Sequence, residues 1–146
     1  LLGGPLYDWF NISIPFTPVA VVMAETFVAL PFLVLTVEGA LRSRERRYED
    51  IAGSLGASRW RVAQKVTLPL VAPAIGAGAV LAWARAIGEF GATITFAGNF
   101  PGRTQTVPLA VYQALESNRD AAIVMSLILV LVSVLVLMSM RDRWRV

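Results

Sequence analysis

Uncharged hydrogen-bonding side chains are concentrated in one stretch, EFGATITFAGNFPGRTQT, which runs from Glu89 to Thr106. Its donors are mainly hydroxyls and amides, and they follow a strongly apolar segment. Such groups hydrogen-bond the oxygens of a polar solute, and a path that must release its cargo needs weak contacts rather than fixed cations. The stretch therefore indicates either a polar conduit or an ordinary glycine–threonine turn. The candidate conduit residues are Gly91, Thr93, Thr95, Asn99, Thr104 and Gln105.

Two charged residues lie where this stretch begins. Arg85 and Glu89 are four residues apart, so on a helix they can form an ion pair. In the alternative interpretation Arg85 faces the conduit and attracts an anion, while Glu89 orients it. Glu25 lies in another apolar segment and must face protein or water rather than lipid. It could pair with Arg85, but an acid would repel an anion, so we interpret Glu25 as structural.

The sequence excludes several kinds of chemistry. It contains no cysteine and no histidine, which removes disulfides, cysteine metal sites, cysteine nucleophiles and histidine general bases. It also lacks the G-x-x-x-x-G-K-[ST] phosphate loop, so any ATP hydrolysis must occur in a partner. We expect no enzyme activity in this chain, with no catalytic residue, cofactor or metal. A membrane enzyme is the least favoured class.

Hydropathy predicts the helices that position these residues. The chain is 56% hydrophobic and 16% charged, and residues 121–140 form an uncharged run of twenty. A helix of that length spans about 30 Å, the thickness of a bilayer core. A chain of 146 residues is too short to bury such a helix in a soluble core. Residues 16–41 and 68–88 are further apolar runs. We predict an all-α integral membrane fold with about three transmembrane helices.

Small residues recur every fourth position in the second of these spans. They lie on one helical face, which in lipid allows another backbone to approach closely. The stripe predicts helix packing without identifying the partner helix. Its members are Ala74, Gly78, Ala82 and Ala86.

The arginines and the lysine are distributed unevenly between the connecting segments. Ten lie between the first two spans or after the third, whereas two lie between the second and third. The positive-inside rule then places residues 42–67 and the C-terminus in the cytoplasm, and residues 1–15 and 89–120 outside. The net charge of +3 is explained by this topology, so no nucleic-acid partner is expected. The cations are Arg42, Arg44, Arg46, Arg47, Arg59, Arg61, Lys65, Arg141, Arg143 and Arg145 on one side, with Arg103 and Arg119 on the other.

Residues 42–67, called the basic loop below, combine charge with apolar anchors. Ile51 and Leu55 lie on one helical face, Gly56 interrupts the run, and residues 57–66 can form a second short helix before Pro69 starts the next span. Two short helices of this kind suit docking on another protein. A loop lying on the membrane surface is an equally good interpretation of the pattern alone.

The basic loop resembles the EAA loop of permease subunits of ATP-binding-cassette importers. The resemblance is carried by Asp50-x-Ala52-x-x-x-Gly56 followed by Val66-x-Leu68-Pro69, with Asp50 and Ile51 replacing the usual glutamate and first alanine. In that family the loop forms a coupling helix that inserts into the cytoplasmic ATPase subunit. The resemblance implies that the coupling residues are Asp50, Ala52, Gly56, Ala57, Ser58, Leu68 and Pro69.

The family also implies an assembly. We expect a multi-pass protein of a prokaryotic plasma (inner) membrane, with two cytoplasmic ATP-binding subunits, a second permease copy as a homodimer, an external binding protein and contacts to membrane lipid. Such permeases have five or six spans, so three spans suggest the C-terminal portion of one.

Residues 88–112 carry a narrower resemblance. They are similar to the corresponding region of molybdate-type permeases, chiefly in the segments ATITFAGN and GRTQT. This implies an external molybdate-binding protein and import of a tetrahedral dianion along Arg85 and the conduit residues. Sulfate or tungstate uptake is the alternative within the family. A noncatalytic scaffold that recruits a cytoplasmic partner through its basic loop is the alternative from another class, but a scaffold has no reason to carry the Gly56 and Leu68-Pro69 pattern.

Overall fold

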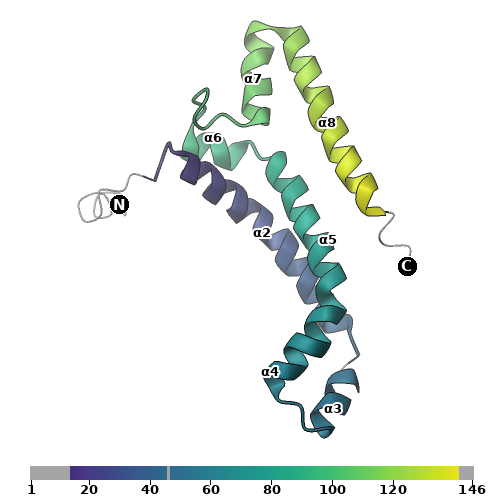
Figure 1. Ribbon diagram of the computed structural model, residues 1–146. Helices are drawn as coiled ribbons and strands as arrows, with labels where there is room; N and C mark the ends of the chain where they lie inside the picture. Colours follow the sequence, from purple (N-terminus) through teal and green to yellow (C-terminus); the bar gives the residue numbers. More distant parts are fainter. Residues whose placement is uncertain (1–13, 46, 142–146) are drawn as a thin grey trace, which may run out of the picture. The chain divides into compact units, whose positions relative to one another are not determined.

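The computed structural model describes residues 14–45 and 47–141, with the side chains of 139–141 left out (Figure 1). Every regular element in these ranges is a helix, which confirms the predicted all-α fold. The predictions for residues 1–13, Arg46, Arg143 and Arg145 lie outside the described part of the chain. The elements are α2 (Pro18–Ser43), α3 (Arg47–Ser54), α4 (Arg59–Val62), the π-helix η1 (Ala63–Thr67), α5 (Leu68–Ile87), α6 (Gly91–Ala97), α7 (Val107–Ser117) and α8 (Arg119–Arg141).

Three helical runs are long and apolar enough to cross a membrane, as predicted. They are Pro18–Ser43, Arg59–Ile87 and Arg119–Met138. The second run begins earlier than the sequence suggested, because α4, η1 and α5 follow one another without a break. Pro69 therefore lies in the first turn of α5, directly after the π-helical segment, rather than at a break between helices.

The backbone contacts divide the chain into two units. Unit 1 comprises the residues up to Ala29 and those from Trp83 onward, and unit 2 comprises Leu30–Ala82. Helices α2 and α5 contribute residues to both units.

Within unit 2, Gly78 marks a close approach between α5 and α2. A Cβ placed on Gly78 would lie 3.0 Å from Leu33 Cδ1 and 3.2 Å from both the Cα and the carbonyl oxygen of Leu33. Gly78 is buried, whereas a Cβ on Gly76, two residues earlier, would have no atom within 4 Å in the part of the chain that the structure describes. One member of the small-residue stripe, Gly78, thus packs against α2.

We expect Gly78→Ala to destabilise the permease by about 1–2 kcal/mol relative to Gly76→Ala, because the added methyl group meets the α2 backbone and must push it away. The matched Gly76→Ala change gains helix propensity with no contact to disturb. Thermal unfolding of the complete permease in detergent measures the difference. Equal melting temperatures for the two variants would contradict the close approach.

Within unit 1, α7 and α8 pack as a helical hairpin (Figure 1). Leu109 and Ala114 of α7 and Ala122 of α8 are buried. The turn between the helices is fixed by Asn118, whose Oδ1 accepts a hydrogen bond from the Ala121 amide at 3.1 Å and so caps α8. Many other apolar side chains of α8, such as Leu127 and Leu131, are exposed, as expected for a helix that faces lipid or other spans.

The segment predicted as an external loop, residues 89–120, contains two helices. Its glycines and threonines suggested irregular structure, yet Gly91–Ala97 forms α6 and Val107–Ser117 forms α7. The start of α7 carries a recognisable signal, because Thr106 is the N-cap and a proline stands in its first turn.

Candidate functional site

Gly56 ends α3 in a Schellman motif. Its φ is +83°, its amide donates to the Gly53 carbonyl at 3.0 Å, and the Ala57 amide donates to the Ala52 carbonyl at 3.1 Å. This pair of bonds requires the left-handed conformation, which glycine adopts without strain. A Cβ on Gly56 would meet no atom of the described residues within 4 Å, so the backbone angle rather than space selects glycine here.

The other predicted coupling residues frame this turn. Asp50 lies in the first turn of α3, where a negative charge complements the helix dipole. Ser58 is the N-cap of α4, and its Oγ accepts a hydrogen bond from the Arg61 amide at 3.4 Å. Leu68 and Pro69 start α5. The structure therefore brings the predicted set into one helix–turn–helix that leads directly into a spanning helix.

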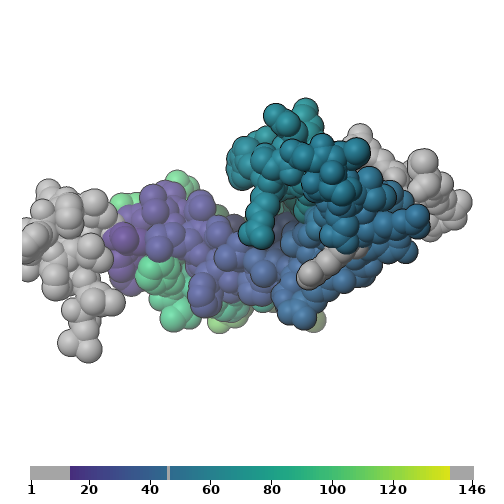
Figure 2. Space-filling view, turned by 90° about the horizontal axis from the view of Figure 1, so that it is seen from below, coloured from purple at the N-terminus to yellow at the C-terminus, as the bar shows by residue number. Residues whose placement is uncertain are grey.

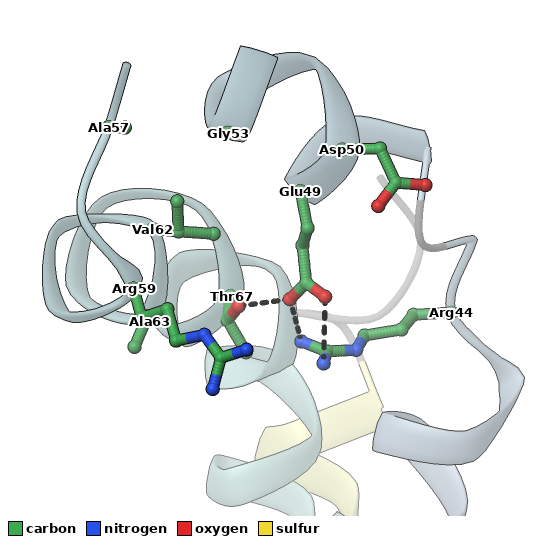
Figure 3. A pocket seen from close by; sticks show the side chains of 9 residues that line it. All are labelled: Arg44, Glu49, Asp50, Gly53, Ala57, Arg59, Val62, Ala63 and Thr67. Atoms are coloured by element: carbon green, nitrogen blue, oxygen red, sulfur yellow. Dashed lines mark hydrogen bonds and ion pairs between the residues drawn. The ribbon is translucent and has the colours of Figure 1, made fainter. Parts of the chain in front are cut away.

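A hollow of about 640 Å³ lies between α3 and the α4–η1 run. Figure 2 shows it between the blue and teal surfaces of this region, and Figure 3 shows the side chains around it. Its wall contains both charged and small residues. The lining residues are Arg44, Glu49, Asp50, Gly53, Ala57, Arg59, Val62, Ala63 and Thr67.

The most connected side chain in this hollow, Glu49, was missed by the sequence analysis. Its carboxylate accepts a hydrogen bond from the Thr67 hydroxyl and forms an ion pair with Arg44, with 2.6 Å between Oε1 and the Arg44 NH1 atom. The partners lie 18 and 5 residues away in sequence. Local spacing rules cover pairs three or four apart on one helix, so they give no signal for this cluster.

The basic loop also exposes large apolar side chains. Leu55 is 82% exposed and Trp60 is 73% exposed, and Ile51, one turn before Leu55, is exposed as well. Exposed apolar groups of this size mark protein or membrane contacts.

At the other candidate site, the predicted Arg85–Glu89 ion pair is present, with 2.7 Å between Arg85 NH1 and Glu89 Oε2. Glu89 is buried, and its Oε1 accepts a hydrogen bond from the Ala92 amide in the first turn of α6 at 2.8 Å. The Ala92 hydrogen bond and the Arg85 guanidinium together lower the pKa of Glu89 against the opposing effect of burial. Glu89 therefore joins the end of α5 to the start of α6.

We expect Glu89→Gln to destabilise the permease by about 1–3 kcal/mol at neutral pH, because the Ala92 amide and Arg85 lose a charged acceptor. Since folding lowers the pKa of Glu89, its stabilisation is present above its ordinary value of 4.5 and is lost as the pH falls below that value. Melting temperatures of the complete permease at pH 7 and pH 4 measure this. The variant should lose less stability on acidification than the wild type, and equal losses would contradict the assignment.

The candidate conduit residues differ in whether their polar side chains already form hydrogen bonds within the segment. The Thr95 hydroxyl donates to the Gly91 carbonyl at 2.8 Å, and the Gln105 amide donates to Gln113 Oε1 at 2.6 Å. Thr104 is buried, and its hydroxyl accepts a hydrogen bond from the Phe100 amide at 3.1 Å. Among the described residues, the buried oxygens Thr93 Oγ1 and Asn99 Oδ1 have no hydrogen-bond partner.

Residues 98–105 form a tight turn supported by an aromatic pair. The Phe100 carbonyl accepts from the amides of residues 103, 104 and 105, and the Phe16 and Phe100 rings meet edge to face at 6.2 Å. Gly98 and Gly102 have φ of +73° and +71°. A Cβ on Gly98 would lie 2.9 Å from Phe100 Cε2 and 3.2 Å from Phe16 Cδ1. Glycine at position 98 thus meets two requirements: it adopts the positive φ, and it leaves space for the rings of Phe16 and Phe100.

Glu25 lines a cavity of about 410 Å³ in unit 1 together with Gln105 and Thr106. The rest of the wall is apolar and comes mainly from α8. Within the described residues Glu25 forms no ion pair with Arg85, whose guanidinium is paired with Glu89.

Comparison with known proteins identifies the family to which this chain belongs. Residues 2–143 match the family described as the binding-protein-dependent transport system inner membrane component. The chain belongs to this family. The match spans nearly the whole chain, including the basic loop and all three membrane-crossing runs.

Relatives in the family bear specific names. The molybdenum transport system permease protein ModB of Mycobacterium tuberculosis is 49% identical over 142 residues, which cover 97% of this chain and 54% of that protein. The protein of the same name from Escherichia coli is 41% identical over 140 residues, covering 92% and 61%. A probable sulfate transport system permease protein of Chlorella vulgaris is 38% identical over 113 residues, covering 77% and 42%. The chain therefore spans about half the length of these relatives.

Proposed function

We propose that this chain forms part of the transmembrane permease subunit of an ATP-binding-cassette importer that carries molybdate into a prokaryotic cytoplasm. The observation that carries the proposal is its identity to two molybdenum permeases over almost its whole length. Sulfate import is the second candidate, because the sulfate permease of Chlorella vulgaris is nearly as similar over a shorter stretch.

The basic loop is the contact to the cytoplasmic ATP-binding subunits in this proposal. Its helix–turn–helix carries exposed Leu55 and Trp60 on a strongly charged background, and it continues without a break into α5. An ATP-binding subunit that binds this loop tightly therefore moves the spanning helix α5 with it. ATP hydrolysis on the partner then drives the rearrangement of the spans, while a second permease copy completes the path.

The proposed orientation follows from charge. The cations of the basic loop support a cytoplasmic position for it under the positive-inside rule, and in this proposal residues 89–120 face the external molybdate-binding protein. The 146 residues contain no cysteine, so single cysteines introduced at Ser54 and Arg103 report sidedness once any cysteine elsewhere in the complete permease is replaced. A membrane-impermeant thiol reagent should label position 103 in intact cells and position 54 only in inside-out vesicles. The reverse pattern would overturn the orientation.

The 89–106 segment is the outer part of the proposed molybdate path. Arg85 attracts the dianion, and the oxygens of Thr93 and Asn99 can exchange hydrogen bonds with it, since among the described residues they have no hydrogen-bond partner. Thr95, Thr104 and Gln105 contribute mainly by shaping the segment, because their polar groups are already bonded. Gly91 starts α6, whose first turn is already bonded to Glu89 through the Ala92 amide.

The proposal is tested by uptake of radiolabelled molybdate into vesicles that carry the complete permease, its ATP-binding partner and its binding protein. Uptake should require ATP and all three components. Accumulation that proceeds equally well without ATP would exclude an ATP-driven importer. Absence of molybdate uptake together with ATP-driven sulfate uptake would establish the second candidate instead.

A further inference from the structure

One carboxylate joins three segments of the basic loop. Glu49 lies in the first turn of α3, Arg44 immediately follows α2, and Thr67 is the last residue of η1 (Figure 3). Arg44 is held by two contacts, an ion pair of 2.6 Å from NH1 to Oε1 and a hydrogen bond from NH2 to Oε2 of 3.2 Å. Thr67 donates its hydroxyl hydrogen to Oε1. The Glu49 carboxylate is therefore bound on both oxygens.

This cluster is protected from solvent, unlike the neighbouring ion pair of α2. The side chains of Arg44 and Glu49 are 22% and 21% exposed, whereas Arg42 and Glu38 form an exposed pair one turn apart. Exposed pairs contribute little, but a shielded charge that loses its partner is costly. Among the described residues Arg44 has no other charge partner, and its Nε has no hydrogen-bond acceptor. Glu49 is thus the group on which the position of Arg44 depends.

Thr67 connects this cluster to a spanning helix through an unusual turn. It ends the π-helical segment Ala63–Thr67, and the next amide, that of Leu68, donates to the Ala63 carbonyl five residues back. Short π-helical segments within α-helices are frequently found at functional sites. Thr67 is followed directly by α5, so a displacement of α3 passes through Glu49 to α5 on one side and through Arg44 to α2 on the other.

We propose that Glu49 is a positioning residue that clamps α3 to the ends of both α2 and α5, so that the basic loop moves as one rigid piece. This rests on the proposed function, in which the ATP-binding partner acts on this loop. Asp50, the acidic residue of the family pattern, is not part of the clamp, since no hydrogen bond or ion pair joins its side chain to Arg44, Glu49 or Thr67 in Figure 3. Without the clamp, the partner would move α3, and the motion would not be transmitted fully to α2 and α5.

The test uses the complete transporter and the ratio of oxyanion imported to ATP hydrolysed. Glu49→Ala should lower this ratio about tenfold while ATP hydrolysis persists. Glu49→Gln, which can still accept from Thr67, should lose less. Exchanging the charges in the double variant Arg44→Glu/Glu49→Arg should restore at least half of the ratio. Glu38→Ala is the matched control, because it removes an exposed carboxylate of α2 from the same region, and it should stay within twofold of wild type.

A second readout does not depend on transport. Spin labels on cysteines at Ser54 and Ala72 report the distance between α3 and α5 within unit 2. Glu49→Ala should broaden the distance distribution, and the charge exchange should narrow it again. An unchanged distribution, or a wild-type transport ratio in Glu49→Ala, would overturn the clamp. A wild-type transporter without ATP-driven uptake would overturn the proposed function instead, and the spin-label distances would still decide on the clamp.

Discussion

Replacing Gly56 with Val is expected to reduce the number of oxyanions imported per ATP hydrolysed about tenfold, while the permease still inserts into the membrane. The left-handed conformation of Gly56 costs an L-residue about 1–2 kcal/mol, and a β-branched residue tolerates it worst. A cost of that size shifts the population of the docking-competent turn by roughly tenfold. Simultaneous measurement of ATP hydrolysis and uptake in vesicles gives the ratio.

The control for this prediction separates backbone angle from side-chain size. Gly56→Asn also adds a side chain, but asparagine adopts the left-handed conformation more readily than valine does. The Asn variant should therefore retain at least a third of the wild-type ratio. Open space around Gly56 means that size alone has no effect. If Val and Asn variants lost coupling equally, the Schellman turn would not be the feature that matters.

Replacing Gly98 with Ala is expected to destabilise the permease by about 2–4 kcal/mol and to lower molybdate uptake more than tenfold. Two costs add here, the positive φ of +73° and the approach of the new methyl group to Phe100 at 2.9 Å. The Phe100 ring can move aside only by giving up its contact with Phe16. Thermal unfolding and uptake by the complete transporter measure the two effects.

Gly102→Ala is the matched control for Gly98→Ala. Its φ is also positive, at +71°, but no atom of the described residues lies within 4 Å of the added methyl group. The loss should therefore be about 1–2 kcal/mol. The double variant Gly98→Ala/Phe100→Ala should recover part of the stability by removing the clash. A Gly98→Ala variant no less stable than Gly102→Ala would show that the aromatic pair does not constrain this turn.

Features set by local chemistry were predictable from the sequence. The uncharged run 121–140 falls within α8, because twenty residues without a charge, most of them apolar, suit a membrane-crossing helix. The i, i+4 spacing of Arg85 and Glu89 predicted their ion pair. Gly56 was recognised as the interruption between two short helices, since a glycine that follows a helical run is the usual C-terminal signal.

Features that depend on distant residues were not predictable. Helix α6 contains glycine and threonines that favour other structures, and it is held by a carboxylate that precedes it, Glu89. The Glu49 cluster joins residues from 44 to 67, which no local pattern relates. Likewise, the small-residue stripe indicated a packing face, but only the structure identifies Leu33 as the neighbour of Gly78.

The central claim, that this chain belongs to a molybdate permease, is tested most directly by competition during uptake. Vesicles that carry the complete transporter and its binding protein are given labelled molybdate with a hundredfold excess of unlabelled molybdate, tungstate or sulfate. We predict that unlabelled molybdate abolishes the signal and that sulfate lowers it less than twofold, while the response to tungstate shows how far the site distinguishes the two similar dianions. Suppression by sulfate as complete as that by molybdate would contradict the assignment.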